Sequence, residues 1–102
     1  MGIFSIFGRS KTNEKVEALL AKGALIIDVR TPAEYAGGHI TESVNIPLDT
    51  IPGKLNDLKR KNKAIITCCR SGARSGMAAN QLRNAGIEAE NGGPWNKVKA
   101  MM

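Results

Sequence analysis

The stretch Ala64-Ile65-Ile66-Thr67-Cys68-Cys69-Arg70-Ser71-Gly72-Ala73-Arg74-Ser75 decides the fold of this chain. It begins as a short apolar run of the kind that forms a buried β-strand, and it ends in a loop rich in Arg, Ser and Gly. The residues that follow, 76–85, have the composition of a helix that stops at Gly86. The predicted order is therefore a strand, a cysteine, a cationic loop and a helix.

A loop of this kind is a favourable place for a negatively charged group. The first backbone N–H groups of a helix are unpaired and lie at the positive end of the helix dipole, so they bind anions. The same environment stabilises a thiolate over a thiol and makes a cysteine nucleophilic near neutral pH. Arg70 and Arg74 add positive charge and forked donors that match tetrahedral oxyanions. The stretch therefore predicts a reactive sulfur that meets an anionic substrate.

Position in the strand distinguishes the two cysteines. Cys69 is the last residue before the loop, so we expect its sulfur at the centre of the loop, among the amides that follow. Cys68 lies one step earlier and should point to the opposite face, as a small buried residue packed against helices. A buried, unreactive thiol is the alternative for Cys69 as well. The two arginines, Gly72 and the following helix favour the reactive interpretation.

Four segments of the chain follow a recognisable pattern. They are Cys69-Arg70-Ser71-Gly72-Ala73-Arg74-Ser75, Ile27-Asp28-Val29-Arg30-Thr31-Pro32-Ala33-Glu34-Tyr35, Gly38-His39-Ile40 with Val44-Asn45-Ile46-Pro47, and Asn91-Gly92-Gly93. They resemble the active-site loop, the Asp-Val-Arg segment, the Gly-His-Ile and Asn-Ile-Pro pieces and the late Gly-Gly turn of the single-domain rhodaneses, the thiosulfate sulfurtransferases. The resemblance covers Val16 to Val98. It departs from the family where Pro94-Trp95 follow the glycines at once, which affects the packing of the last helix.

The resemblance implies a fold, a reaction and a set of site residues. The fold is an α/β, three-layer rhodanese-like domain in which Cys69 carries a persulfide. The implied reaction moves a sulfane sulfur from a small anionic donor, thiosulfate or a persulfide, to a thiol or cyanide acceptor. A sulfur-accepting protein is a further expected partner, and neither a cofactor nor a metal is expected. The expected substrate-binding residues are Arg70, Ser71, Gly72, Ala73, Arg74 and Ser75.

The rest of the chain alternates helices and strands, which predicts a single α/β domain over residues 1–102 with a mainly parallel sheet flanked by helices. In such sheets ligands lie beyond the carboxyl ends of the strands, where Cys69 is expected. Residues 1–11 are expected to form an N-terminal arm or short strand. The expected strands are 24–27, 43–46, 64–68 and a weaker one at 87–90. The expected helices run from Thr12 or Asn13 to Ala21, from Thr31 to Gly37 with Glu34 in a capping box, from about Pro52 to Arg60, over 76–85 and from Trp95 to Met101.

Composition narrows the class of protein. A chain of 102 residues can build one core, and aromatic residues at 4% make that core aliphatic. The net charge of +6 includes one basic cluster, residues 59–63, which we interpret as a solvated helix end. No nucleic-acid motif is present. Adjacent cysteines do not form a disulfide framework, so a reducing, cytoplasmic location is expected. The apolar N-terminal segment is too short to span a membrane.

Other polar residues have two interpretations each. Asp28 and Arg30 could take part in catalysis, but we expect a structural charge pair near the site. His39 could be a general base, but its place in a Gly-His-Ile loop favours a hydrogen-bonded structural role. Trp95 is expected to pack at the core or its rim.

Two other functions stay open on the sequence alone. The domain could be a sulfur relay that docks on a partner protein, with the basic cluster 59–63 as the docking face. Alternatively, Cys68 and Arg74 complete the Cys-x5-Arg signature of cysteine phosphatases and arsenate reductases. The phosphatase interpretation requires Cys68 to face the loop. It also requires a carboxylic acid to protonate the leaving group, and the loop contains none.

Overall fold

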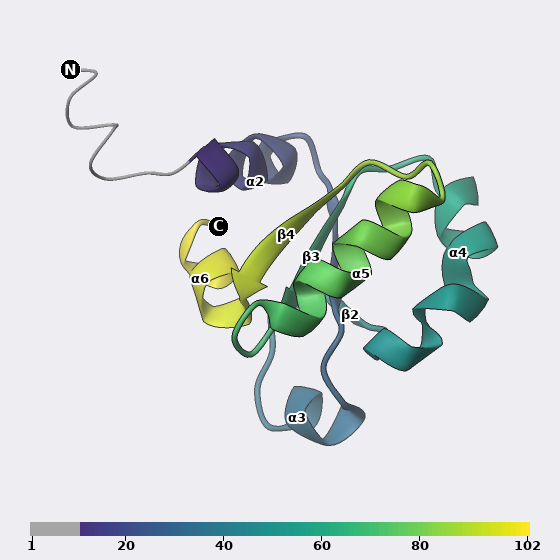
Figure 1. Ribbon diagram of the computed structural model, residues 1–102. Coiled ribbons are helices and arrows are strands. Elements are labelled where there is room, and N and C mark those ends of the chain that lie inside the picture. The colour runs from purple at the N-terminus through teal and green to yellow at the C-terminus, as the bar shows by residue number, and fades with distance from the viewer. Residues whose placement is uncertain (1–10) are drawn as a thin grey trace, which may run out of the picture.

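The computed structural model describes residues 11–102 (Figure 1). The N-terminal arm predicted for residues 1–11 lies outside the described residues except for Lys11, which begins the first helix. The elements in chain order are α2 (Lys11–Ala21), β1 (Leu25–Asp28), α3 (Pro32–Ala36), β2 (Val44–Asn45), the 3-10 helix η1 (Leu48–Thr50), α4 (Ile51–Arg60), β3 (Ile65–Cys69), α5 (Ala73–Asn84), β4 (Ala89–Pro94) and α6 (Trp95–Ala100).

The sheet has the strand order β2-β1-β3-β4, and every neighbouring pair is parallel. Its two central strands, β1 and β3, are the continuous apolar runs of the sequence, as expected for strands covered on both faces. All four strands therefore end at the same edge, and Cys69 is the last residue of β3 there. The α/β class with a parallel sheet is confirmed.

Helices cover both faces of this sheet, which gives the three layers that were predicted (Figure 1). On one face α4 and α5 contribute Leu58 and Leu82 to a core cluster that includes Ile27 and Ile65. The helices α2 and α6 pack Val16, Leu19 and Val98, among others, on the opposite face. Burying one such aliphatic side chain contributes about 1.5–3 kcal/mol. Among the helices of residues 11–102, none combines the length and the apolar character that crossing a bilayer would need.

The short helix α3 lies beyond the carboxyl edge of the sheet, and its start is the predicted capping box (Figure 1). The Thr31 hydroxyl accepts from the Glu34 N–H at 3.3 Å, and the Glu34 carboxylate accepts from the Thr31 N–H at 3.1 Å. Because both groups are satisfied locally, the chain can turn away from β1 at Thr31 without unpaired donors. This places Glu34 next to the loop that follows β3.

The last strand is displaced from its predicted position. We expected residues 87–90, but β4 runs from Ala89 to Pro94, so the Asn91-Gly92-Gly93 segment is part of the strand and not a free turn. Ile87 still belongs to the helix exit, since its N–H donates to the Leu82 carbonyl. Gly92 is a point of close packing in this strand. A Cβ there would meet Val98 at 2.6 Å and Ile66 at 2.9 Å, so only glycine allows α6 and β3 to approach this closely.

Candidate active site

The loop after β3 closes around the sulfur of Cys69. The backbone N–H groups of Gly72 and Ser75 donate to Sγ at 3.0 and 3.4 Å, and the Ser75 hydroxyl oxygen lies 3.2 Å from it. Gly72 can begin α5 because its φ of +105° is open to glycine and strained for other residues. The predicted position of Cys69, at the centre of the loop and at the N-terminus of a helix, is what the structure contains.

Hydrogen bonds decide the ionisation of Cys69. Burial of the sulfur raises its pKa, but the donors from the Ser75 side chain and from the backbone of Ser75, Gly72 and Ser71 outweigh that effect. The net result is a pKa below the ordinary value of 9.0. Cys69 has no exposed surface, so the loop whose donors lower the pKa of the sulfur also covers it.

Cys68 faces the other side of the sheet, as predicted. It belongs to the core cluster with Val16, Ile66 and Val98. Burial, and secondarily the charge of Asp28, raises the pKa of this thiol to about 12. The Cys-x5-Arg count that starts at Cys68 therefore does not describe the loop, because its sulfur points away from the amides. This removes the basis for a phosphatase of that kind.

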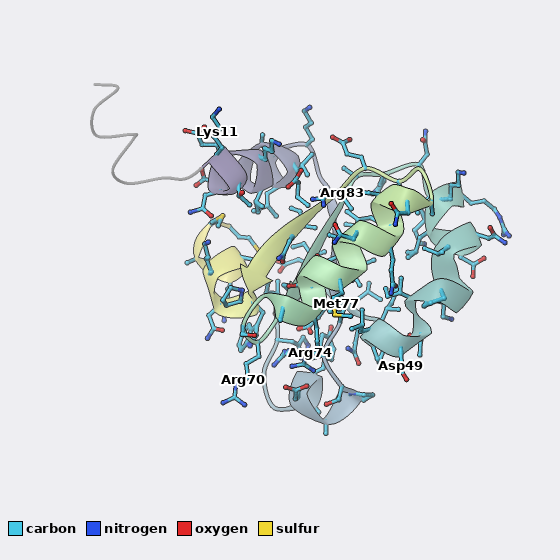
Figure 2. The ribbon with its side chains drawn as sticks, in the orientation of Figure 1. Lys11, Asp49, Arg70, Arg74, Met77 and Arg83 are labelled. Carbon is cyan, nitrogen blue, oxygen red and sulfur yellow. The ribbon has the colours of Figure 1, made fainter. Side chains whose placement is uncertain are left out.

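The two loop arginines are in different situations. Arg74 binds both carboxylate oxygens of Glu34, at 2.7 and 3.0 Å, so its charge is already compensated by α3. Arg70 is exposed, and within residues 11–102 no hydrogen bond or ion pair engages its guanidinium. Figure 2 shows Arg74 between α5 and α3 and Arg70 projecting outward from the loop. We expected both arginines to offer their charge to an anion, whereas in the structure Arg74 is already paired with Glu34.

Arg70 borders a hollow of about 330 Å³ beside the loop. Its other lining residues are Arg30, Ala33, Glu34, Gly37, Gly38, Trp95 and Asn96. The guanidinium of Arg30 is buried at the base of this region in a bidentate pair with Asp28, with Nη2 at 2.8 Å from Oδ2. It also donates to the Gly38 carbonyl and lies 5.0 Å from the centre of the Trp95 ring. The structural charge pair and the packing role of Trp95 are both confirmed.

His39 has the structural role that was predicted. Its Nδ1 lies 2.7 Å from the Tyr35 carbonyl oxygen, and its ring stacks on the Tyr35 ring with centroids 3.7 Å apart. These contacts stabilise the segment between α3 and β2, and neither of them involves the Cys69 sulfur.

Two residues at the site were not identified from the sequence. Glu34 was recognised as a helix cap, but its partner Arg74 is 40 positions away and no local pattern joins them. Asn91 accepts from the Ser75 hydroxyl at 2.6 Å and donates to the Gly72 carbonyl at 3.0 Å. The only sequence feature that singled out Asn91 was its position before a Gly-Gly pair, and that feature predicted a turn and not a residue of the site.

The remaining loop residues surround the same centre. Ser71 and Ala73 are exposed at the mouth of the loop, whereas Ser75 is buried beside the sulfur. Behind the loop, the Thr67 hydroxyl donates to the Ser75 carbonyl at 2.7 Å and so ties the first turn of α5 to β3. The site is thus assembled from β3, α5, β4 and α3.

Comparison with known proteins places this arrangement in a family. The chain is 40% identical over 78 residues to the uncharacterized protein YqhL of Bacillus subtilis, covering 76% of this chain and 60% of that protein. It is 39% identical over 62 residues to a protein of Allochromatium vinosum named sulfurtransferase, covering 61% of this chain and 57% of that one. The chain therefore spans about 60% of the length of these two curated relatives.

A solved structure agrees with the sequence matches. The rhodanese-like domain protein from Staphylococcus aureus superimposes with a TM-score of 0.68 at 36% identity, covering 84% of each chain. The family model described as the rhodanese-like domain matches residues 12–96, which contain every strand and the Cys69 loop. This chain therefore belongs to the rhodanese-like domain family.

Proposed function

We propose that this protein is a sulfurtransferase that carries sulfane sulfur as a persulfide on Cys69. The observation that supports this most directly is the set of donors around one sulfur, the Gly72 N–H at 3.0 Å and the Ser75 N–H at 3.4 Å, with the Ser75 hydroxyl at 3.2 Å. Such donors favour a thiolate over a thiol and need no separate base to activate it. The relative named sulfurtransferase favours the same reaction class.

The proposed reaction has two displacement steps. The Cys69 thiolate attacks the outer sulfur of thiosulfate, the S–S bond breaks, and its electron pair leaves with sulfite. The outer sulfur stays on Cys69 as a persulfide. An acceptor, either a thiolate or cyanide, then attacks that outer sulfur, and Cys69 leaves as the thiolate. A persulfide on another molecule can replace thiosulfate as donor, with a thiolate leaving in place of sulfite.

The loop is proposed to bind the anionic donor and then the terminal persulfide sulfur. We assign substrate binding to the backbone amides and the two guanidinium groups of the loop residues, which are Arg70, Ser71, Gly72, Ala73, Arg74 and Ser75. Charge-assisted hydrogen bonds from such groups are about twice as strong as neutral ones. Arg70 can give a full positive charge, because within residues 11–102 it has no ion-pair partner. Arg74 contributes while it shares its charge with Glu34.

A sulfur relay between proteins is the second candidate, and the Glu34–Arg74 pair is the observation that favours it. Because Glu34 compensates one of the two loop cations, a small free dianion gains less from the site than the sequence suggested. The basic cluster 59–63 is an unsuitable docking face for this purpose. It joins the end of α4 to the start of β3, whereas Cys69 lies at the other end of that strand. The reducing, cytoplasmic location that suits two free cysteines is part of both proposals.

The first experiment asks whether Cys69 takes up sulfur. The protein is incubated with thiosulfate, and its intact mass is measured before and after cyanide is added. We expect a gain of one sulfur atom that cyanide removes, and no gain in Cys69→Ala. The matched control is Cys68→Ala, which removes the neighbouring thiol and should leave the gain intact. Sulfur uptake by Cys69→Ala would show that the assignment is wrong.

A second measurement distinguishes free enzyme from relay. Turnover with thiosulfate and cyanide is compared with single-turnover transfer from a persulfidated donor protein. Slow turnover with thiosulfate and fast protein-to-protein transfer would favour the relay. Rapid, saturable turnover with thiosulfate alone would favour the enzyme that uses the free donor.

A further inference from the structure

Asn91 is connected to the Cys69 sulfur through a single hydroxyl group. Its Oδ1 accepts from the Ser75 hydroxyl at 2.6 Å and from the Gly93 N–H at 2.9 Å. Its Nδ2 donates to the Gly72 carbonyl at 3.0 Å. The Ser75 oxygen lies 3.2 Å from the Cys69 sulfur. One side chain of β4 therefore contacts two of the loop residues that donate to the sulfur, Gly72 and Ser75.

The partners of Asn91 determine which end of its amide faces Ser75. The Gly72 carbonyl can only accept a hydrogen bond, and the Gly93 N–H can only donate one. A reversed amide would place two acceptors against each other at Gly72 and two donors against each other at Gly93. Gly76 leaves room for the amide in this place, because a Cβ there would lie only 3.1 Å from Nδ2. Oδ1 therefore faces Ser75 and acts there only as an acceptor.

The Ser75 hydroxyl has one hydrogen and two acceptors within reach. While the Cys69 sulfur is a thiol, the thiol can donate to Ser75, and Ser75 donates to Asn91. Once the sulfur is an anion it can only accept, and a hydrogen bond to a charged acceptor is stronger than one to a neutral amide. The hydroxyl hydrogen then turns to the sulfur. Oδ1 keeps the Gly93 N–H, so no buried acceptor is left without a partner.

We propose that Asn91 is a positioning residue of the site, which holds the Ser75 hydroxyl hydrogen while the Cys69 sulfur is neutral and releases it to the sulfur when the sulfur is anionic. This inference rests on the proposed function, in which Sγ is an anion before it attacks, neutral while it carries the outer sulfur, and an anion again afterwards. Because Asn91 competes with the Cys69 sulfur for the Ser75 hydroxyl hydrogen, it stabilises the sulfur-loaded protein relative to the unloaded thiolate.

Each substitution considered below leaves the native charged groups near the sulfur in place. On α5, Arg74 is paired with Glu34 of α3. On the β1 side, Asp28 and Arg30 pair with each other behind Cys68. A change in Cys69 ionisation that follows a substitution of Asn91 therefore comes either through Ser75 or from a charge that the substitution adds.

The first test uses the unaltered protein. The side-chain amide of Asn91 is followed by NMR during a pH titration, and the Cys69 thiolate is followed by its ultraviolet absorbance. We expect the amide signals to shift with the same midpoint as the thiolate signal, because Oδ1 loses one hydrogen bond as the sulfur ionises. In Ser75→Ala the Asn91 shift should disappear. Absence of the shift in the unaltered protein, or an equal shift in Ser75→Ala, overturns the proposal.

The second test is a double-mutant cycle with Asn91→Asp and Ser75→Ala. A carboxylate retains the hydroxyl hydrogen more strongly than an amide, so we expect the pKa of Cys69 to rise by about one unit, a tenfold loss of thiolate. The rise should be clearly smaller in the Ser75→Ala background, where the added charge alone acts. Asn96→Asp is the matched control, since it adds a charge at the exposed rim, and within residues 11–102 Asn96 makes no hydrogen bond to the loop.

Equal rises in the two backgrounds would show that the introduced carboxylate acts by charge alone, and they would overturn the proposal. Both tests measure ionisation and need no sulfur donor. A protein that fails to take up sulfur would contradict the proposed function and leave these measurements unaffected. A normal sulfur gain with no coupling between Asn91 and Ser75 would contradict only the inference about Asn91.

Discussion

The two faces of β3 make very different environments for two adjacent cysteines. Neither Cys68 nor Cys69 has exposed surface. Cys68 lies among aliphatic side chains, where burial raises its pKa to about 12. Cys69 is also buried, yet the donors from Gly72 and Ser75 bring its pKa below 9.0. Burial alone therefore does not set the pKa of a thiol in this protein, because the hydrogen bonds that reach its sulfur can outweigh it.

Selective alkylation tests this comparison most strongly. At pH 8 the thiolate fractions of the two cysteines should differ by more than about 1,000-fold, given pKa values of about 12 for Cys68 and below 9.0 for Cys69. We expect a small alkylating reagent to modify Cys69 alone in the folded protein, as measured by peptide mapping. In denaturant both should react, which serves as the control. Comparable modification of Cys68 in the folded protein would remove the distinction.

Gly72→Ala should break the Cys69 side of the comparison. The φ of +105° strains any side chain, and a Cβ there would approach the Gly93 Cα at 3.4 Å. We expect the Gly72 N–H to move off the sulfur and the rate of sulfur uptake to fall by about 100-fold, the usual cost of one lost donor at an anion site. The rate is measured by intact mass against time.

The control for that experiment is Gly53→Ala in the exposed part of α4, where a Cβ meets nothing within 4 Å. This change should stabilise the helix by about 0.5–1 kcal/mol and leave sulfur uptake unchanged. An unchanged rate in Gly72→Ala would mean that the loop amides contribute little to the reaction.

Cys68→Ser should affect the other face. It places a hydroxyl in the cluster of Val16, Ile66 and Val98, and an unpaired buried hydroxyl costs about 1–3 kcal/mol. We expect the free energy of unfolding in urea to fall by that amount while sulfur uptake persists. Cys68→Ala, which buries no polar group, is the control and should lose less stability. Loss of uptake in a folded Cys68→Ser protein would show that the two faces are not independent.

Glu34→Gln tests a smaller effect beside the Cys69 loop. The hydrogen bond from Arg74 is the main cause that lowers the pKa of Glu34 from 4.5 to about 2. A carboxylate whose pKa is lower in the folded state stabilises the protein above its unfolded pKa, and this contribution is lost as the pH falls through the folded pKa. Stability should therefore decrease from about pH 4.5 to about pH 2, and less steeply in Glu34→Gln.

The measurement is the urea midpoint as a function of pH. Glu42→Gln is the matched control, because Glu42 is exposed and within residues 11–102 forms no ion pair. If both variants change the acid-side slope equally, the Glu34–Arg74 pair does not stabilise the folded protein.

Local patterns in the sequence were enough to predict the layers of the fold and the position of Cys69 at the centre of the loop. The apolar runs of β1 and β3 predicted buried parallel strands, and alternation along β3 separated Cys68 from Cys69. These features depend on neighbours in the chain, so a single sequence contains them. The capping box of Glu34 was predicted for the same reason.

Features that depend on distant contacts were not predictable. The sequence 91–93 looks like a turn because of its glycines, but Gly92 is there to let β3 and α6 approach. The pairing of Glu34 with Arg74 and the bond between Asn91 and Ser75 join segments that meet only in the folded sheet. Each alters the loop that the sequence identified, by compensating a charge or by engaging a hydroxyl.

The complete burial of Cys69 has a kinetic consequence. Because the sulfur has no surface open to solvent, any reagent must wait for the loop to open, and an observed rate is the intrinsic rate multiplied by the open fraction. Two contacts tie the loop to its neighbours, Arg74 to Glu34 and Gly72 to Asn91, so weakening either should raise the open fraction. Under the proposed function, the same closure would shield a Cys69 persulfide from other nucleophiles, so the lifetime of the carried sulfur would depend on how often the loop opens.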